Sequence, residues 1–406
     1  MPKQLFIIAL TLGLGLSACQ APLSTTDTEV SVTTTSAQSA ASFLTLNVGK
    51  APHGIAANAD FVYNANAGEN TLSVIDTHQD QVVKTLPLST DQTPGYIKAS
   101  HDGKYMLVLS SDKSGAGQLH IFEPANDHRL VQSLSVGQSP DILQLSENDR
   151  DLYISLAGEA GVAHFVFDKG LGSAPTPRQL IEAGSGSREP QGHRALAMSS
   201  GWLLTPNPGN NSVSLISPTG EQRVLRDGNN PGPVALASID GQISEALVGN
   251  SASHTLSLFN VKSGEATTLS DLGQSPTDIA LVPELGRAYV SMAGSNQVAV
   301  VDYLTRQTLG TVKTQQRPVH LYVAPPKEEA DKTTEMQIQH EGHDHDKITE
   351  IWVSNDASAS VTVFNAQTLE VIDNHPVGEG HHKIAFSQNK AYISNLNDNT
   401  LTVIPR

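Results

Sequence analysis

The hydrophobic and polar positions of the chain recur in eight similar units. Each unit opens on a Pro-x-x-Ile/Leu or His-x-x-Ile/Leu signal and continues into runs in which apolar and polar residues alternate. The signals start at Pro52, Pro94, Pro140, His193, Pro233, Pro276, Pro318 and His381. A period of two residues is typical of β-strands, and Asn/Gly clusters between the runs are typical of turns. The pattern therefore predicts short strands joined by tight turns, in units of about 40 residues.

Units of about 40 residues with four short strands each predict an all-β fold, an eight-bladed β-propeller. A seven-bladed ring is the alternative, if the degenerate unit around Trp202 or the long third unit is not a blade. The chain stops after the third strand of the last unit, Thr400 to Ile404, whereas an extra strand at Phe43 to Gly49 precedes the first unit. We expect this N-terminal strand to complete the last blade, because closing the ring hides an exposed sheet edge.

The clearest copies of the unit share one frame without gaps. They are Tyr63-Asn64-Ala65-Asn66 through Asp76, Tyr289-Val290-Ser291 through Asp302, Trp352-Val353-Ser354-Asn355 through Asn365, and Tyr392-Ile393-Ser394-Asn395 through Ile404. In this frame the chain resembles the YVTN (YncE-like) β-propeller repeat family over nearly all of residues 43–406. The resemblance implies the fold but no single function, because propellers of that family do different things.

The first 18 residues are predicted to be a lipoprotein signal peptide. A basic start precedes an apolar run, Leu5 to Leu16, that is too short to span a bilayer with ordinary flanks. Leu16-Ser17-Ala18-Cys19 resembles a bacterial lipobox, which implies that Cys19 is lipidated; a plain secretory signal with an incidental cysteine is the alternative. Gln20 implies a place in the outer membrane facing the periplasm, or at the cell surface. Membrane contact is then expected through the lipid alone.

Residues 19–41 are predicted to be a Ser/Thr-rich tether, and residues 42–406 the propeller. Cys19 is the only cysteine, which excludes an intramolecular disulfide, a thiolate metal cage and a cysteine nucleophile. The net charge of −16 argues against nucleic-acid binding, which needs clustered Lys and Arg. An acidic surface is compatible with a cation as partner, and we expect a monomer.

The chain contains fifteen histidines, a high number for this composition. One group of these histidines lies in an insertion at 325–348. Three imidazoles and three carboxylates stand within seven residues there, which are ligands that zinc, copper and nickel accept. The expected ligands are His340, His343, Asp344, His345 and Asp346. A solvated charged loop without metal is the alternative interpretation.

A second group follows from the phase of the repeat. His53, His320, His381 and His382 all stand in or beside the turn before an innermost strand, on the first, seventh and eighth units. These units are neighbours in a closed ring, so His53, His382 and either His381 or His320 are predicted to form a three-nitrogen metal site at the mouth of the channel. Turn histidines bonded to nearby carbonyls are the alternative. The loop at 340–346 is expected on the opposite face.

Catalytic motifs are absent from the sequence, including Gly-x-Ser-x-Gly, His-Glu-x-x-His and CxxCH. We therefore expect a binding protein and not an enzyme: one that captures or delivers a divalent metal, zinc or copper, to a periplasmic transporter or metalloprotein. In this the chain resembles periplasmic zinc metallochaperones of the AztD type, although its His-rich segment lies late in the chain. A scaffold propeller without metal is the alternative. A lactonase or a quinoprotein-like enzyme is less favoured.

Overall fold

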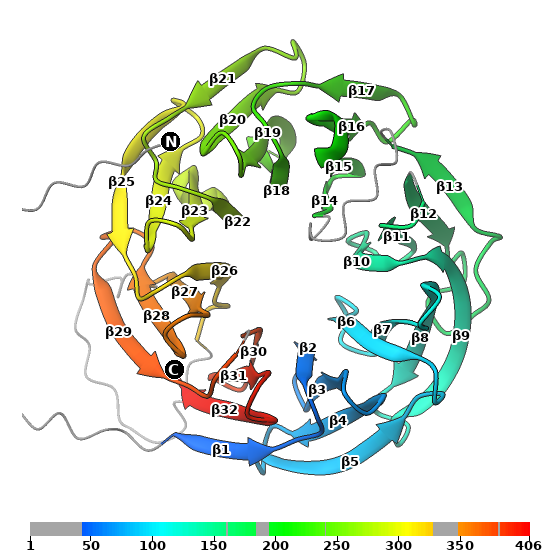
Figure 1. The fold of residues 1–406 in the computed structure, drawn as a ribbon. Coiled ribbons are helices and arrows are strands. Elements are labelled where there is room, and N and C mark those ends of the chain that lie inside the picture. Colours follow the sequence, from blue (N-terminus) through cyan, green and yellow to red (C-terminus); the bar gives the residue numbers. More distant parts are fainter. Residues whose placement is uncertain (1–42, 160, 184–194, 240, 328–347, 381) are drawn as a thin grey trace, which may run out of the picture. The chain divides into compact units, whose positions relative to one another are not determined.

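A computed structural model of the chain describes residues 43–159, 161–183, 195–239, 241–327, 348–380 and 382–406. These residues form eight antiparallel four-stranded sheets, which stand as blades around a central axis (Figure 1). The prediction of an eight-bladed β-propeller is confirmed, and the seven-bladed alternative is not needed. The unit around Trp202 and the long third unit each form a complete blade.

The strands of a blade follow one another from the axis outward (Figure 1). Blades 1 to 4 consist of β2 (Pro52–Ala57), β3 (Phe61–Asn66), β4 (Thr71–Asp76) and β5 (Gln81–Pro87); β6 (Thr93–Ala99), β7 (Met106–Ser111), β8 (Ala116–Glu123) and β9 (Arg129–Gln138); β10 (Pro140–Leu145), β11 (Asp151–Leu156), β12 (Gly161–Val166) and β13 (Gln179–Glu182); and β14 (Ala197–Ser199), β15 (Trp202–Asn207), β16 (Ser212–Ile216) and β17 (Gln222–Leu225).

Blades 5 to 8 continue in the same order. They consist of β18 (Pro231–Ile239), β19 (Gln242–Asn250), β20 (Thr255–Asn260) and β21 (Ala266–Leu269); β22 (Pro276–Val282), β23 (Arg287–Met292), β24 (Gln297–Asp302) and β25 (Gln307–Lys313); β26 (Pro318–Val323), β27 (Glu350–Asn355), β28 (Ser360–Asn365) and β29 (Val371–Pro376); and β30 (Ile384–Ser387), β31 (Lys390–Asn395), β32 (Thr400–Pro405) and β1 (Leu44–Asn47). Two 3-10 turns, η1 (Pro208–Asn210) and η2 (Pro283–Leu285), lie in blades 4 and 6. In the part of the chain described here, no helix has the length and apolar character needed to cross a bilayer.

The ring closes by pairing its first strand with its last. β1 runs antiparallel to β32, with Leu44 opposite Val403 and Asn47 opposite Thr400. The N-terminal strand therefore completes blade 8, as the sequence predicts. This pairing covers the edge that β32 would otherwise expose to other chains.

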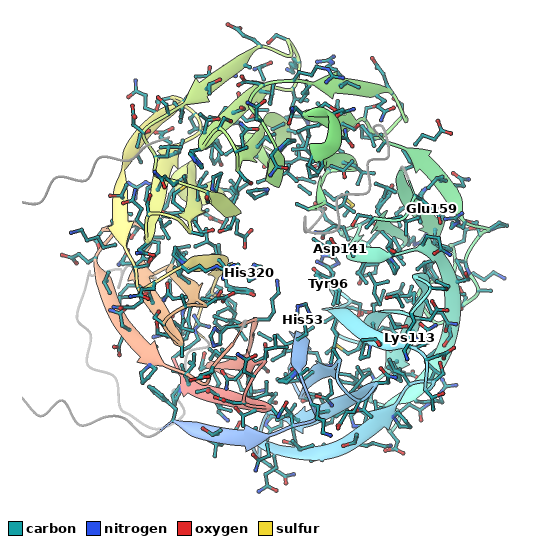
Figure 2. The ribbon with its side chains drawn as sticks, in the orientation of Figure 1. His53, Tyr96, Lys113, Asp141, Glu159 and His320 are labelled. Atoms are coloured by element: carbon teal, nitrogen blue, oxygen red, sulfur yellow. The ribbon has the colours of Figure 1, made fainter. Side chains whose placement is uncertain are left out.

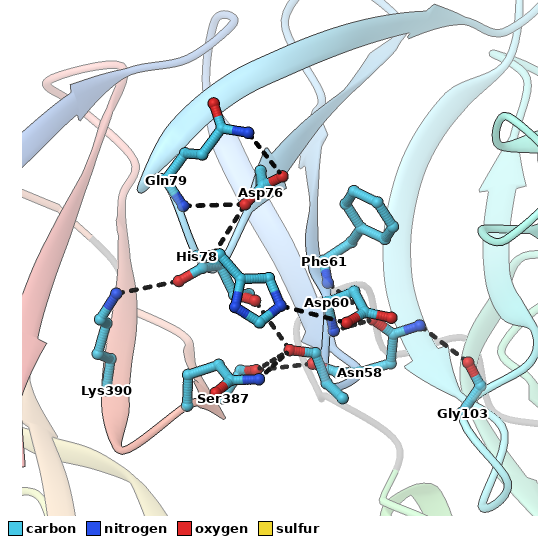
Figure 3. Close-up of polar contacts among 12 residues, drawn as sticks. Asn58, Asp60, Phe61, Asp76, His78, Gln79, Gly103, Ser387 and Lys390 are labelled. Atoms are coloured by element: carbon cyan, nitrogen blue, oxygen red, sulfur yellow. Dashed lines mark hydrogen bonds and ion pairs between the residues drawn. The ribbon is translucent and has the colours of Figure 1, made fainter.

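Polar contacts also join blade 8 to blade 1 (Figure 3). Lys390 Nζ donates to the Thr77 carbonyl at 3.0 Å and to Asp80 Oδ2 at 2.7 Å. Ser387 Oγ donates to the Asn58 carbonyl at 2.8 Å. Side-chain bonds from blade 8 to the backbone of blade 1 and to Asp80 therefore hold the two blades together, in addition to the strand pairing that completes blade 8.

The core is divided among the seams between blades. Eight clusters of buried apolar residues occur in the described part of the chain, and each draws its members from two neighbouring blades. Leu119 of blade 2, for example, shares a cluster with Leu143 and Ile154 of blade 3. A blade on its own would expose both of its faces, so the apolar side chains of each repeat are buried only inside the ring.

An asparagine at the end of the second strand fastens five of the blades. Asn355 Nδ2 donates to Ser360 Oγ at 3.3 Å and to Thr362 Oγ1 at 3.0 Å. The same bonds, to hydroxyls five and seven residues later, are made by Asn66, Asn207, Asn250 and Asn395. All five asparagines are buried, so they clamp each hairpin from within and are more than turn residues.

Candidate functional site: the central cavity and its rim

A cavity of about 930 Å³ lies among the innermost strands of the eight blades. Each of β2, β6, β10, β14, β18, β22, β26 and β30 contributes at least one residue to its wall. Figure 2 shows His53, Tyr96, Asp141 and His320 around the central opening of the ring. The cavity is the place where residues far apart in the sequence come together.

The repeat signal itself selects the side chains of this wall. The third residue of every Pro-x-x-Ile/Leu or His-x-x-Ile/Leu signal lines the cavity: Gly54, Tyr96, Ile142, Ala195, Ala235, Asp278, His320 and Lys383. In several inner strands a register shift follows the opening proline, as between Pro94 and Ile97 and between Pro318 and His320. Such bulges redirect side chains. At Gly54 a Cβ would come within 2.0 Å of the Gly95 carbonyl, so only glycine fits there.

Three consecutive blades place polar groups at this third position, and these groups meet. Lys383 Nζ lies 2.9 Å from His320 Nε2 and 3.4 Å from His320 Nδ1. His320 Nδ1 lies 3.5 Å from Asp278 Oδ2. Blades 6, 7 and 8 thus build a chain of carboxylate, imidazole and ammonium along the wall.

The backbone holds Asp278 in this chain. Its Oδ2 accepts the Leu321 amide at 3.0 Å, and its Oδ1 accepts the Ile279 amide at 2.9 Å. Burial by itself would raise the pKa of Asp278, but the hydrogen bond and charge of His320, with the Leu321 amide, bring that pKa below its ordinary value. Burial lowers the pKa of Lys383, and nearby carboxylates, Asp278 foremost, oppose this.

Two tyrosines complete the polar part of the wall. Burial, with Asp141 and Asp278 nearby, raises the pKa of Tyr96 to about 12. Burial also raises the pKa of Tyr322, and Asp278 adds to the effect. Both phenols therefore keep their protons at neutral pH and can donate hydrogen bonds.

A second pair lies at the rim, beside the cavity. His382 is fully buried, and its Nε2 donates to the Gly378 carbonyl at 2.7 Å. Its Nδ1 faces Asp356 Oδ1 at 3.6 Å and has no hydrogen-bond partner. Asp356 lines both the central cavity and a smaller cleft of about 400 Å³ that Glu379 and Asn397 also line.

The structure separates histidines that the sequence analysis placed in one three-nitrogen metal site. His53 and His320 line the cavity (Figure 2), whereas His382 turns toward Gly378 and Asp356. His381, His340, His343, Asp344, His345, Asp346 and Cys19 lie outside the described residues. Within the described residues, no three His, Cys, Asp or Glu side chains form a group that could hold a metal ion.

Sequence reasoning missed Tyr96, Asp278, Lys383 and Asp356. The first three stand at the third position of their signals, so aligning the eight signals and reading that column would have found them. Asp356 does not stand in one of the eight opening signals. It follows Asn355 in the turn after β27 and reaches the site only because blades 7 and 8 meet there.

No family model matches the chain, and no curated protein sequence matches it. Solved structures do resemble it. The Saccharomyces cerevisiae protein Sqt1 has a TM-score of 0.66 at 12% identity, over 89% of this chain and 98% of its own. The dihydro-heme d1 dehydrogenase NirN, solved in complex with DHE, has a TM-score of 0.59 at 13% identity, over 88% of this chain and 75% of its own.

Virginiamycin B lyase from Staphylococcus aureus, solved as its selenomethionine form, has a TM-score of 0.51 at 12% identity, over 90% of this chain and 99% of its own. These neighbours are β-propellers of varied function. The likeness is one of fold alone. What the chain binds has to be argued from its own residues.

Proposed function

We propose that the protein is a binding propeller that captures a divalent transition-metal ion, zinc or copper, at the rim of its central cavity. The observation that carries the proposal is the pair formed by His382 and Asp356. His382 donates through Nε2 to the Gly378 carbonyl, and its Nδ1, which carries a lone pair in the neutral form of such an imidazole, faces a carboxylate oxygen at 3.6 Å. That separation is too long for a hydrogen bond, which spans about 2.7–3.2 Å.

The pair suits two ligands of one ion. Two donors that each lie about 2.0 Å from a tetrahedral ion are about 3.3 Å apart, close to the separation observed. Ligating histidines usually donate their other ring N–H to a carbonyl or carboxylate, as His382 does to Gly378. An imidazolium–carboxylate ion pair is the metal-free interpretation of the same geometry.

Further donors are proposed from the sequence. His381 is the neighbour of His382 in the chain and is proposed as a third donor at the rim. His340, His343, Asp344, His345 and Asp346 are proposed as a separate set of loosely held, fast-exchanging ligands, because their loop is expected on the opposite face. His53 and His320 lie on the cavity wall and do not belong to the rim pair; His320 is already in contact with Lys383 and Asp278. The ion is cargo here, and its recipient is proposed to be a periplasmic transporter or metalloprotein.

The location is proposed from the N-terminus. Lipidation at Cys19 would anchor a monomer to the outer membrane, facing the periplasm. Labelling cells with a fatty-acid analogue tests this, because the label should appear on the wild type and disappear in Cys19→Ser. An unlabelled wild type would leave a plain secreted protein.

Zinc and copper(II) titrations of the full chain, against a chromophoric chelator, test the metal proposal. Asp356→Asn and His382→Gln should each weaken binding by about tenfold or more. The matched control is Asp373→Asn. Its His375–Asp373 pair has a similar 3.5 Å separation, but it stands on the outer strand β29, where half of the Asp373 side chain is exposed. Equal affinity in all four proteins would refute the rim site. No binding by the wild type would favour a scaffold propeller.

A further inference from the structure

The central cavity offers more than the rim pair uses. Its volume of about 930 Å³ lies within the range of about 300–1,000 Å³ that is usual for small-molecule sites. Tyr96, Tyr322 and Lys383 also line this cavity. The proposed metal ligands are His382 and Asp356, so these three side chains play no part in the metal site. A ligand of another kind can therefore be sought there.

The wall has two unlike parts. Blades 4 and 5 line it with small or apolar side chains, among them Ala197, Met198, Val234 and Ala235. Their inner strands, β14 and β18, are neighbours in the ring and lie on the side away from β2 (Figure 1). Blade 5 adds only Asn230 and Ser251 as polar lining residues, and the charged and phenolic side chains of the described wall come from the other blades. A ligand would therefore meet a mainly apolar surface on one side and charged and phenolic groups on the other.

The polar part retains donors. The described residues give the Tyr96 hydroxyl no hydrogen-bond partner, and its raised pKa keeps the proton in place. The Ile384 amide faces the oxygen of Tyr322, which leaves the phenolic proton of Tyr322 for a ligand. Lys383 directs its ammonium at His320, and an ammonium has three N–H donors in total.

The polar part also retains acceptors. Asp278 Oδ1 accepts one backbone amide, that of Ile279, and a carboxylate oxygen has room for a second bond; Oδ2 already meets the Leu321 amide and His320. Asp141 stands near Tyr96 on the same wall. Donors and acceptors are therefore interleaved around one space.

The charges on the wall oppose an ionic ligand of either sign. Three carboxylates line the cavity, those of Asp141, Asp278 and Asp356, and so do the cations Arg317 and Lys383. An anion would approach the carboxylates and a cation would approach Lys383, at a cost that grows where water is excluded. A neutral molecule with many hydroxyls avoids both, because each hydroxyl donates to a carboxylate and accepts from a tyrosine or the ammonium.

We infer that the central cavity binds a neutral, hydroxyl-rich small molecule, of the size and chemistry of a mono- or disaccharide. Its hydroxyl edge contacts Tyr96, Tyr322 and Lys383, and its C–H face packs on the apolar wall of blades 4 and 5. Asp356 lines this cavity as well as taking part in the proposed metal pair, but Tyr96 and Tyr322 take no part in that pair, so either proposal can fail without the other.

Isothermal titration of the full chain with D-glucose, maltose and myo-inositol tests the inference. At least one of these probes should bind at a single site at millimolar concentration or below. Tyr96→Phe and Tyr322→Phe should each weaken that binding about tenfold, the value of one hydrogen bond to a ligand hydroxyl. Tyr105→Phe, which removes a phenol outside the cavity wall, should leave it unchanged.

Gluconate and glucosamine test the argument from charge. Both should bind less tightly than the best neutral probe. The inference is wrong if none of the three neutral probes binds, if both cavity phenylalanine variants bind as the wild type does, or if either charged probe binds more tightly than every neutral one.

Discussion

Lys383 and His320 meet on the cavity wall, with Lys383 Nζ 2.9 Å from His320 Nε2. The ammonium thus stands against the imidazole nitrogen that an incoming metal ion would need. His382, which precedes Lys383 in the chain, belongs to the rim pair. A positive charge therefore separates the proposed rim site from the imidazole on the wall.

Replacing Lys383 by Met should tighten zinc binding by the full chain about tenfold, because the substitution removes a cation close to the rim pair and to His320. Chelator competition at constant salt measures the change. Lys113→Met, on an exposed loop away from the cavity (Figure 2), is the control for net charge and should have no effect. Unchanged or weaker binding by Lys383→Met would show that the ammonium does not oppose the ion.

The stability of the fold should fall in mild acid because of His120. Burial lowers the pKa of His120 to about 4, from an unfolded value of 6.5. The unfolded chain therefore binds the extra proton first, and stability is lost as the pH falls from 6.5 toward 4. Between pH 7 and pH 5 this residue alone should account for about 2 kcal/mol of the free energy of unfolding.

Urea unfolding of the wild type and of His120→Gln at the two pH values measures this difference. The variant loses contacts of His120 with Ser110 and Ser133, so it should be less stable at pH 7 but should depend less on pH. His78→Gln, at an exposed histidine, should keep the wild-type dependence. If wild type and His120→Gln lose the same free energy on acidification, His120 is not the cause.

The buried asparagine clamp should be worth about 2 kcal/mol in each blade that has it. Asn355→Ala removes the buried amide that donates to the hydroxyls of Ser360 and Thr362. The midpoint of unfolding in guanidinium chloride should fall accordingly. Met292 occupies the equivalent position of blade 6, so Met292→Ala serves as the control for lost volume without lost bonds. The idea fails if Asn355→Ala unfolds at the wild-type midpoint.

Removing residues 43–48 should open the ring at blade 8. The deletion leaves β32 as an exposed edge and uncovers Leu401 and Val403, which pack with β1 and blade 1. We expect a lower melting temperature by calorimetry and larger species on a sizing column. Leu44→Ser, at a side chain that is about half exposed, should change neither. A deletion that stays monomeric with the wild-type melting temperature would contradict the closure role of β1.

The sequence was sufficient to predict the ring and its closure. Both depend on local patterns, an opening signal that recurs eight times and an extra strand before the first unit, and these patterns survive in each blade. The resemblance to one propeller family adds nothing that the repeat itself does not predict about the fold. Neighbours with about 12% identity lead to the same conclusion.

The candidate site was harder to predict, because side-chain direction depends on geometry that the repeat phase does not reveal. His53 and His382 both stand second in their signals, yet His53 lines the cavity and His382 turns toward Gly378. The pairing of β2 with β3 shifts register between Pro52 and Ile55, around His53, whereas His382 precedes β30 and lies outside its pairing with β31. Asp356 came near His382 only through the packing of two blades. The recurrent asparagines are typical of turns in the sequence, and a single sequence does not reveal that their side chains are buried.

The third residues of the eight signals form a ring of cavity-lining positions at which the residue type can vary. Each of these eight residues belongs to a different blade. Ala235 and Ile142 also pack in the seams between blades, whereas Ala195 belongs to none of the apolar clusters of the described residues. A substitution at Ala195 would therefore alter what the cavity recognises without disturbing the packing of the blades. Ligand preference in such a ring is open to stepwise change, one blade at a time, both in evolution and in design.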